Sequence, residues 1–118
     1  MTQEEKQLLL KDLCARLPYG VKVQCDKYPF PVTILYAGDL NEVKFKETGG
    51  IEHIDCVMPY LRPMSSMTEE ETKIHGDLIC NCQNYEVVDW LNAHHFDYRG
   101  LIEKGLALEA PEGMYEIG

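Results

Sequence analysis

The segment WLNAHHFDYRGL, residues 90–101, carries the densest group of reactive side chains in the chain. His94 and His95 adjoin an aspartate, a tyrosine and an arginine, which are residue types used for proton transfer and, for histidine and aspartate, metal binding. On a helix, however, adjacent side chains are rotated by about 100°, and metal-binding histidines are usually spaced i, i+4. The spacing therefore favours a helix end, in which His95 continues the apolar face and Asp97 caps the following turn.

The sequence Cys-Asn-Cys offers a second candidate, a metal site or a cysteine nucleophile built with the two histidines. The candidate residues are Cys80, Cys82, His94 and His95. Structural zinc sites usually show two Cys-x2-Cys pairs or a matching pair of histidines, and this chain has a single Cys-x-Cys. A reactive thiolate needs an electropositive setting, whereas residues 68–118 hold 11 acidic and 3 basic side chains. We keep a metal- or cysteine-dependent enzyme as an alternative, and predict no catalytic residue and no cofactor.

A third candidate is a helical pair over residues 85–104, because two helices joined by a short turn occur in DNA-binding folds. Its second helix, YRGLIEKG, is short, contains a helix-weakening glycine and carries only two basic side chains. Phosphate backbones reward lysine and arginine, and the acidic second half of the chain offers few of them. We therefore expect no nucleic acid as a partner, and keep a nucleic-acid-binding helical module as the last alternative.

The composition is that of an ordinary globular domain, with 118 residues, 45% of them hydrophobic and 26% charged. This length predicts one domain spanning residues 1–118. The formal net charge of −9 is unevenly placed, since residues 1–67 hold 9 acidic and 8 basic side chains. The acidic excess lies almost wholly in the remainder, and such a surface can steer basic partners toward it.

The first residues of the chain and its cysteines indicate in which cell compartment the protein is found. The sequence MTQEEKQLLLKDLC has an acidic flank and only three consecutive leucines, which is unlike a secretory signal peptide. No apolar run approaches the length of a membrane span. We therefore expect a cytoplasmic protein with no membrane partner, in which all five cysteines stay reduced.

Two capping boxes predict helix starts, because a threonine and a glutamate three residues later satisfy each other's backbone donors. The first box, Thr2 with Glu5, predicts a helix over residues 3–16. The second box lies in the sequence TEEE at 68–71 and predicts a helix over residues 69–79.

A third helix is expected to begin with Asn84 as its cap. Its predicted buried stripe consists of Val87, Val88, Leu91 and His95. Asp97 then caps one last short turn over residues 98–105, which Gly105 ends.

Four segments are predicted to be strands, namely residues 21–26, 32–37, 42–46 and 51–60. Residues 21–26 and 42–46 alternate in polarity with the period of a strand, and residues 32–37 are rich in β-branched and aromatic side chains. In the fourth segment, Ile54, Cys56 and Met58 share the predicted buried face. A turn is expected at Gly38-Asp39 between the second and third segments.

Short connections between successive strands favour an antiparallel arrangement. The sequence therefore predicts an α+β fold: an N-terminal helix, an antiparallel four-stranded meander forming a small SH3-like curved sheet, and two or three C-terminal helices. Residues 106–110 are expected to add an edge strand, and residues 111–118 to form a tail.

Two segments, PYLRPMSSMTEEE (59–71) and WLNAHHFDYRGLIEKGLALEAPEGMY (90–115), resemble a family of small proteins from Bacteroides-type gut bacteria, their phages and integrated elements. They cover about a third of the chain. The family has no assigned activity, so the resemblance transfers no functional residue. It implies a context, that of a cytoplasmic accessory protein encoded by a phage or mobile element.

The first functional hypothesis is a non-enzymatic interaction protein, with a protein partner or self-association. It follows from the weakness of every candidate site and from apolar side chains in loop-like positions. Those side chains are Tyr28, Phe30, Tyr60, Leu61 and Met64. Alternatively, these five side chains pack beneath the helices, and we expect this for most of them.

Overall fold

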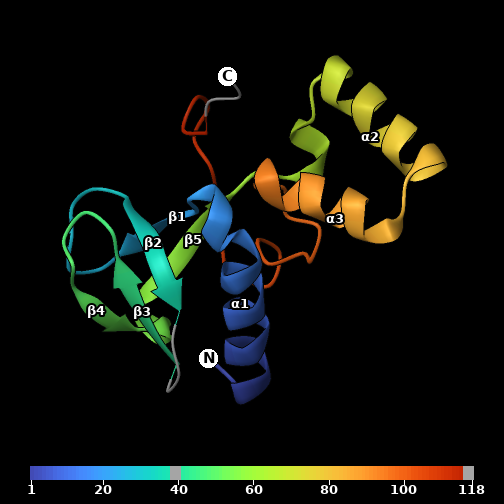
Figure 1. Cartoon of the computed structure of the whole chain (residues 1–118). Coiled ribbons are helices and arrows are strands. Elements are labelled where there is room, and N and C mark those ends of the chain that lie inside the picture. Colours follow the sequence, from blue (N-terminus) through green and yellow to red (C-terminus); the bar gives the residue numbers. More distant parts are fainter. Residues whose placement is uncertain (38–40, 116–118) are drawn as a thin grey trace.

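The computed structural model describes residues 1–37 and 41–115, which form an α+β domain (Figure 1). The first helix, α1 (Gln3–Arg16), spans the predicted residues. Its capping box is formed, because the Thr2 hydroxyl accepts from the Glu5 N–H at 3.1 Å and the Glu5 carboxylate accepts from the Thr2 N–H at 2.8 Å. Local sequence signals were therefore sufficient to place this helix.

One mixed sheet of six strands lies beside α1 (Figure 1). The strands are β1 (Lys22–Cys25), β2 (Val32–Ala37), β3 (Glu42–Phe45), β4 (Ile51–His53), β5 (Val57–Leu61) and β6 (Leu108–Glu109). Their order is β4-β3-β2-β1-β5-β6, with β6 parallel to β5 and the other pairs antiparallel. The α+β class is confirmed, whereas the four-stranded antiparallel meander was wrong.

The prediction failed first at residues 51–60, which form two strands instead of one. A 3-10 turn, Ile54–Cys56, separates β4 from β5, and the His53 ring accepts a hydrogen bond from the Asp55 N–H at its start. After this turn the chain crosses to pair with β1. The turn also changes which side chains face inward, so that Val57, Pro59 and Leu61 are buried in place of the predicted Cys56 and Met58.

The prediction failed a second time at the C-terminal end. The edge strand expected in residues 106–110 exists as β6, but it runs parallel to β5. Residues 111–118 were expected to be a tail, yet the Tyr115 hydroxyl donates to the Tyr60 carbonyl at 2.7 Å and accepts from the Lys22 N–H at 2.9 Å. Residues 116–118, like the turn expected at Gly38-Asp39, lie outside the described residues.

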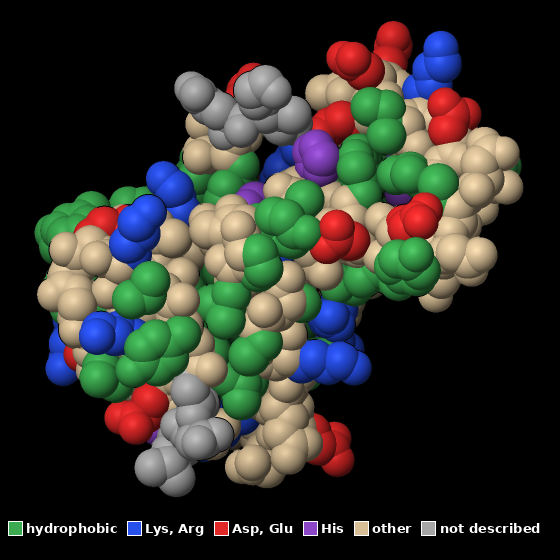
Figure 2. Space-filling view, in the orientation of Figure 1, with side chains coloured by type: hydrophobic (Ala, Val, Ile, Leu, Met, Phe, Trp, Pro, Cys, Tyr) green, Lys and Arg blue, Asp and Glu red, His purple; other side chains and the backbone are tan. Residues whose placement is uncertain are grey.

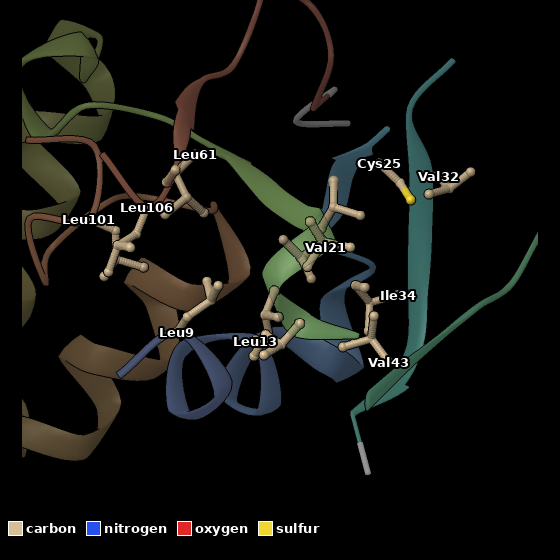
Figure 3. Packing of buried hydrophobic residues seen from close by; sticks show 14 of the residues in the cluster. Leu9, Leu13, Val21, Cys25, Val32, Ile34, Val43, Leu61, Leu101 and Leu106 are labelled. Atoms are coloured by element: carbon tan, nitrogen blue, oxygen red, sulfur yellow. The ribbon is translucent and has the colours of Figure 1, made fainter. Parts of the chain in front are cut away.

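The main hydrophobic core lies between α1 and the sheet (Figure 3). Leu9 and Leu13 of α1 face the inward side chains of the strands, and Leu101 and Leu106 close the core from the C-terminal segment (Figure 3). The core residues in and beside the strands include Val21, Val23, Cys25, Val32, Ile34, Val43 and Phe45. The alternation predicted for residues 21–26 and 42–46 is therefore confirmed.

Two further helices form a hairpin that projects from the body of the molecule (Figure 1). They are α2 (Glu69–Asn81), which is two residues longer than predicted, and α3 (Asn84–Ala93). The capping box of α2 is formed, but the N-cap of α3 is Gln83 instead of the predicted Asn84 and makes no side-chain bond. Residues 98–105 form turns without a helix.

A second, smaller core joins this hairpin to the body. It contains Val87, Leu91 and Phe96, with Met64, Met67, Leu78, Trp90 and Tyr98 packed around them. None of the described helices has the length and apolar character needed to cross a membrane.

Candidate functional site

The histidine-rich segment leaves α3 through a left-handed residue. The helix ends at Ala93, and His95 has a φ of +59°, a conformation that few non-glycine residues adopt. Beyond it the backbone joins the end of β5, because the Arg62 N–H donates to the His95 carbonyl and the Asp97 N–H donates to the Arg62 carbonyl, both at 2.8 Å. The segment is therefore tied to the sheet.

This turn places His95 differently from the prediction. The residue is buried, with 3% of its surface exposed, but it does not continue the helical stripe of Val88 and Leu91. Its Nε2 lies 3.1 Å from the Tyr19 carbonyl, so the ring N–H is at Nε2, and its ring stacks on Tyr115 with centroids 3.9 Å apart. Nδ1 has no partner among the described residues, so only one of the two expected bonds is present.

The environment of His95 suits a structural role. Burial, and secondarily the positive charge of Arg16, lowers the pKa of His95 to about 4. The imidazole is therefore neutral near pH 7 and enclosed by Tyr115. A general base must reach the proton that it removes, and this ring is inaccessible to a substrate.

His94 faces a different group of side chains. Its Nδ1 lies 2.9 Å from the Trp90 carbonyl, and its ring packs on Trp90 with centroids 4.5 Å apart and on Phe96 at 6.4 Å. His75 of α2 stacks on the same indole, with centroids 5.8 Å apart. The prediction that His94 and His95 point apart is confirmed, although the left-handed turn contributes to the divergence.

The two candidate cysteines lie at the other end of α3. Cys80 and Cys82 are exposed where α2 turns into α3, and the ten residues of α3 span about 15 Å before His94. A hydrogen bond with the Glu86 carboxylate raises the pKa of the Cys82 thiol, which disfavours a thiolate. Within residues 1–37 and 41–115, no group of three acidic, histidine or cysteine side chains could hold a metal ion.

A buried ion cluster that we did not predict occupies the centre of this region. Arg16 donates to both carboxylate oxygens of Asp12, at 2.9 and 3.1 Å, and to the Phe96 carbonyl at 2.6 Å. Arg99 adds a bond to Asp12 at 3.2 Å and another to the Tyr98 hydroxyl at 2.9 Å. Asp12 and Arg16 are fully buried, so the charges are balanced inside the protein.

Sequence reasoning missed this cluster, although part of its signal was present. Leu9, Leu13 and Arg16 lie at positions i, i+4 and i+7, so Arg16 falls on the apolar stripe of its helix. A basic side chain on such a stripe, four residues after Asp12, indicates a buried intrahelical ion pair.

Asp97 performs the capping role that the sequence predicted. Its two carboxylate oxygens accept from the backbone N–H groups of Leu101 and Ile102, at 2.8 and 2.9 Å. The side chain is buried, and it holds the turn that carries Leu101 into the main core. Both oxygens are thus occupied, and the carboxylate is not free for catalysis.

A second ion pair fixes the base of the helical hairpin. Arg62, directly after β5, donates two bonds to the Glu71 carboxylate at 2.8 and 2.6 Å, and its guanidinium lies 4.2 Å from the centre of the Phe96 ring. The Arg62 hydrogen bonds hold the pKa of Glu71 at about 2. Glu71 also closes the capping box with Thr68, so one carboxylate orients α2 and ties it to the sheet.

A surface hollow of about 540 Å³ lies beside this ion pair. Its lining comes from residues 62–68 and from residues 109–115, and includes Ser66, Thr68, Glu109 and Glu112. Arg62 also lines the hollow, but Glu71 already occupies its guanidinium. The lining has no histidine or cysteine, and the hydroxyls of Ser66 and Thr68 bond to the Pro63 carbonyl and the Glu71 N–H instead of to Glu109 or Glu112.

Comparison with protein-family models, curated proteins and solved structures finds no match for this chain. The geometry must therefore carry the functional argument alone.

We expect His95→Ala to lower the free energy of unfolding by about 1–3 kcal/mol, because it removes the bond to the Tyr19 carbonyl and the stack on Tyr115. His94→Ala, at a half-buried site, should cost less than about 1 kcal/mol. Urea unfolding of both variants measures the difference. Equal losses would contradict the different roles assigned to the two rings.

Stability should also fall in mild acid because of His95. Its pKa is about 4 in the folded protein and 6.5 as an unperturbed side chain, so its neutral form is favoured by folding. The stability that the neutral His95 contributes is fully present above pH 6.5 and is lost as the pH falls from 6.5 to 4. The free energy of unfolding should fall by about 2 kcal/mol between pH 7 and pH 5. The stability that the ionised Glu71 contributes is lost at lower pH, as the pH falls from 4.5 to about 2.

The pH dependence is measured by urea unfolding at a series of pH values. His95→Asn, which tolerates the left-handed conformation, should flatten the curve between pH 6.5 and pH 4.5 and keep the steeper fall below it. An unchanged slope in this variant would show that His95 is not the titrating group.

Proposed function

We propose that this chain is a non-enzymatic interaction protein whose binding surface lies on the α2–α3 hairpin. Two large apolar side chains beside the turn between these helices are exposed, with exposed fractions of 58% for Ile79 and 70% for Tyr85. Ile74, five positions before Ile79, is 40% exposed on a different side of α2. We call Ile79 and Tyr85 the hairpin surface. Exposed apolar side chains on one projecting element are the single observation that carries the proposal.

The hairpin is exposed on one side and held in a fixed direction at its base. In α2 only Glu71 is buried, and the helix packs on α3 while its opposite face has no cover among the described residues. At its base, the Arg62–Glu71 pair and the small core around Phe96 fix its direction. The Tyr19 hydroxyl donates to Asp89 and ties α3 to the end of α1. A rigid mounting lowers the entropy cost of binding a partner.

The polar groups of the candidate sites support a non-enzymatic role. The carboxylates of Asp97 and Asp12 and the Nε2 of the buried His95 are occupied by bonds within the fold, and Cys80 and Cys82 lie away from the histidines. Residues 69–93 carry six acidic side chains and one basic one, which does not suit a nucleic-acid backbone. Neither enzyme chemistry nor nucleic-acid binding is favoured by a specific contact.

The remainder of the proposal concerns fold and context. The antiparallel run β4-β3-β2-β1-β5, with a 3-10 turn before its last strand, supports a small curved sheet of the SH3-like kind as the scaffold. The family resemblance supports a cytoplasmic accessory protein encoded by a phage or mobile element.

A photo-crosslinking amino acid at position 79 tests the hairpin surface in cells that naturally produce the protein. We expect discrete adducts from position 79, and their loss when Tyr85→Glu is added, because a carboxylate there blocks apolar docking. The control is the same probe at Lys11, an exposed residue on α1. Equal labelling from both positions, or none from position 79, would refute the proposal.

A further inference from the structure

A second exposed apolar surface lies on the outer face of the sheet. Tyr36 of β2 pairs with Lys44 of β3, and Lys44 pairs with Ile51 of β4, so the three side chains form one row across the strands. Tyr36 and Ile51 have exposed fractions of 45% and 53%, and Leu35 beside them has 49%. We call Leu35, Tyr36, Lys44 and Ile51 the sheet surface.

The two surfaces lie at opposite ends of the molecule, whose longest extent is 41 Å (Figure 1). The sheet lies at one end and the hairpin at the other, with α1 between them (Figure 1). A single chain therefore cannot bring its own two surfaces together. Each remains available to another molecule.

The two surfaces differ in charge. On the hairpin, Glu70 and Asp77 lie within one turn of Ile74, and Glu86 adjoins Tyr85. The outer face of the sheet carries three lysines and two carboxylates, namely Lys22, Lys44, Lys46, Glu42 and Glu47. The Glu47 carboxylate already accepts two bonds from Thr33. Figure 2 shows mainly acidic side chains over the hairpin and both basic and acidic side chains over the sheet.

We propose that the hairpin surface of one copy docks on the sheet surface of a second copy. This inference rests on the proposed function and names its partner. Apolar side chains meet apolar side chains, and Lys44 meets the acidic side chains of the hairpin, among them Glu86 next to Tyr85. Contact between two hairpins is disfavoured, because it would place two segments with a net charge of −5 against each other.

Such a contact is head to tail, because different patches meet. An open row of copies always has one free hairpin surface and one free sheet surface at its two ends. The row therefore grows, or its ends meet and close it into a ring. Charged side chains flank both patches, so association should weaken as salt is added.

Analytical ultracentrifugation from micromolar to millimolar concentration tests the contact with two single variants. Ile79→Glu disables the hairpin surface and Ile51→Glu disables the sheet surface; both side chains are exposed, so the fold should persist. We expect the natural chain to associate and each variant to stay monomeric. An equimolar mixture of the two variants should reach twice the monomer mass and no more, since one intact contact remains.

Phe30→Glu is the matched control. Phe30 is 48% exposed but packs on Tyr28, which meets the buried Phe45 on the other side of the sheet. This variant should associate like the natural chain. If either main variant unfolds by circular dichroism, Tyr85→Glu and Tyr36→Glu replace the pair.

Two results would overturn the inference: a natural chain that stays monomeric at millimolar concentration, or a mixture of variants that stays monomeric. In those cases crosslinking from position 79 separates the two proposals. Adducts with a different, basic protein would keep the hairpin as a binding surface and remove the second copy as its partner. Absence of any adduct would remove both.

Discussion

The buried ion pair between Asp12 and Arg16 of α1 determines where the chain must return after α3. Both side chains are fully buried, and moving such charges out of water costs several kcal/mol per ion unless each is paired and hydrogen-bonded. Within α1 the pair satisfies only part of this need. Arg99 and the Phe96 carbonyl supply further bonds, and only Arg16 Nη1 stays without a partner among the described residues. The chain after α3 therefore returns to α1 to meet these charges. The α1 helix thus fixes the position of a segment eighty residues away.

That return explains why the most reactive stretch of the chain serves the fold. To reach Arg16, the backbone leaves α3 through the left-handed His95 and joins the end of β5. Phe96 then lies beneath Arg62, whose other contact is Glu71 at the start of α2. The direction of the hairpin is therefore set by a chain of contacts that begins in α1. A site that binds a substrate needs polar groups that are free to contact it. In this region nearly all of the buried polar groups already bond to other parts of the fold.

The sequence predicted the elements whose causes are local and missed the contacts whose causes are distant. A capping box needs only four residues, and the alternation of β1 and β3 and the β-branched composition of β2 need five or six, so these elements could be predicted. The 3-10 turn at Ile54–Cys56 contains neither glycine nor proline, and nothing nearby indicated it. The bond between Lys22 and Tyr115 joins residues 93 positions apart, which no local pattern encodes. Arg16 was visible on the apolar stripe, but its burial depends on Phe96 and Arg99.

The acidic charge of the hairpin is only partly explained by the stability of its helices. Glu69, Glu70 and Glu71 lie in the first turn of α2, where the helix dipole and the capping box favour carboxylates. Glu86 likewise lies in the first turn of α3, whereas no such requirement places Asp77 beside Ile74. An exposed isoleucine next to carboxylates gains nothing within the folded chain, because apolar surface in water is unfavourable and nearby like charges repel. Its presence on an element held by the Arg62–Glu71 ion pair supports our proposal of a partner surface that is apolar and basic.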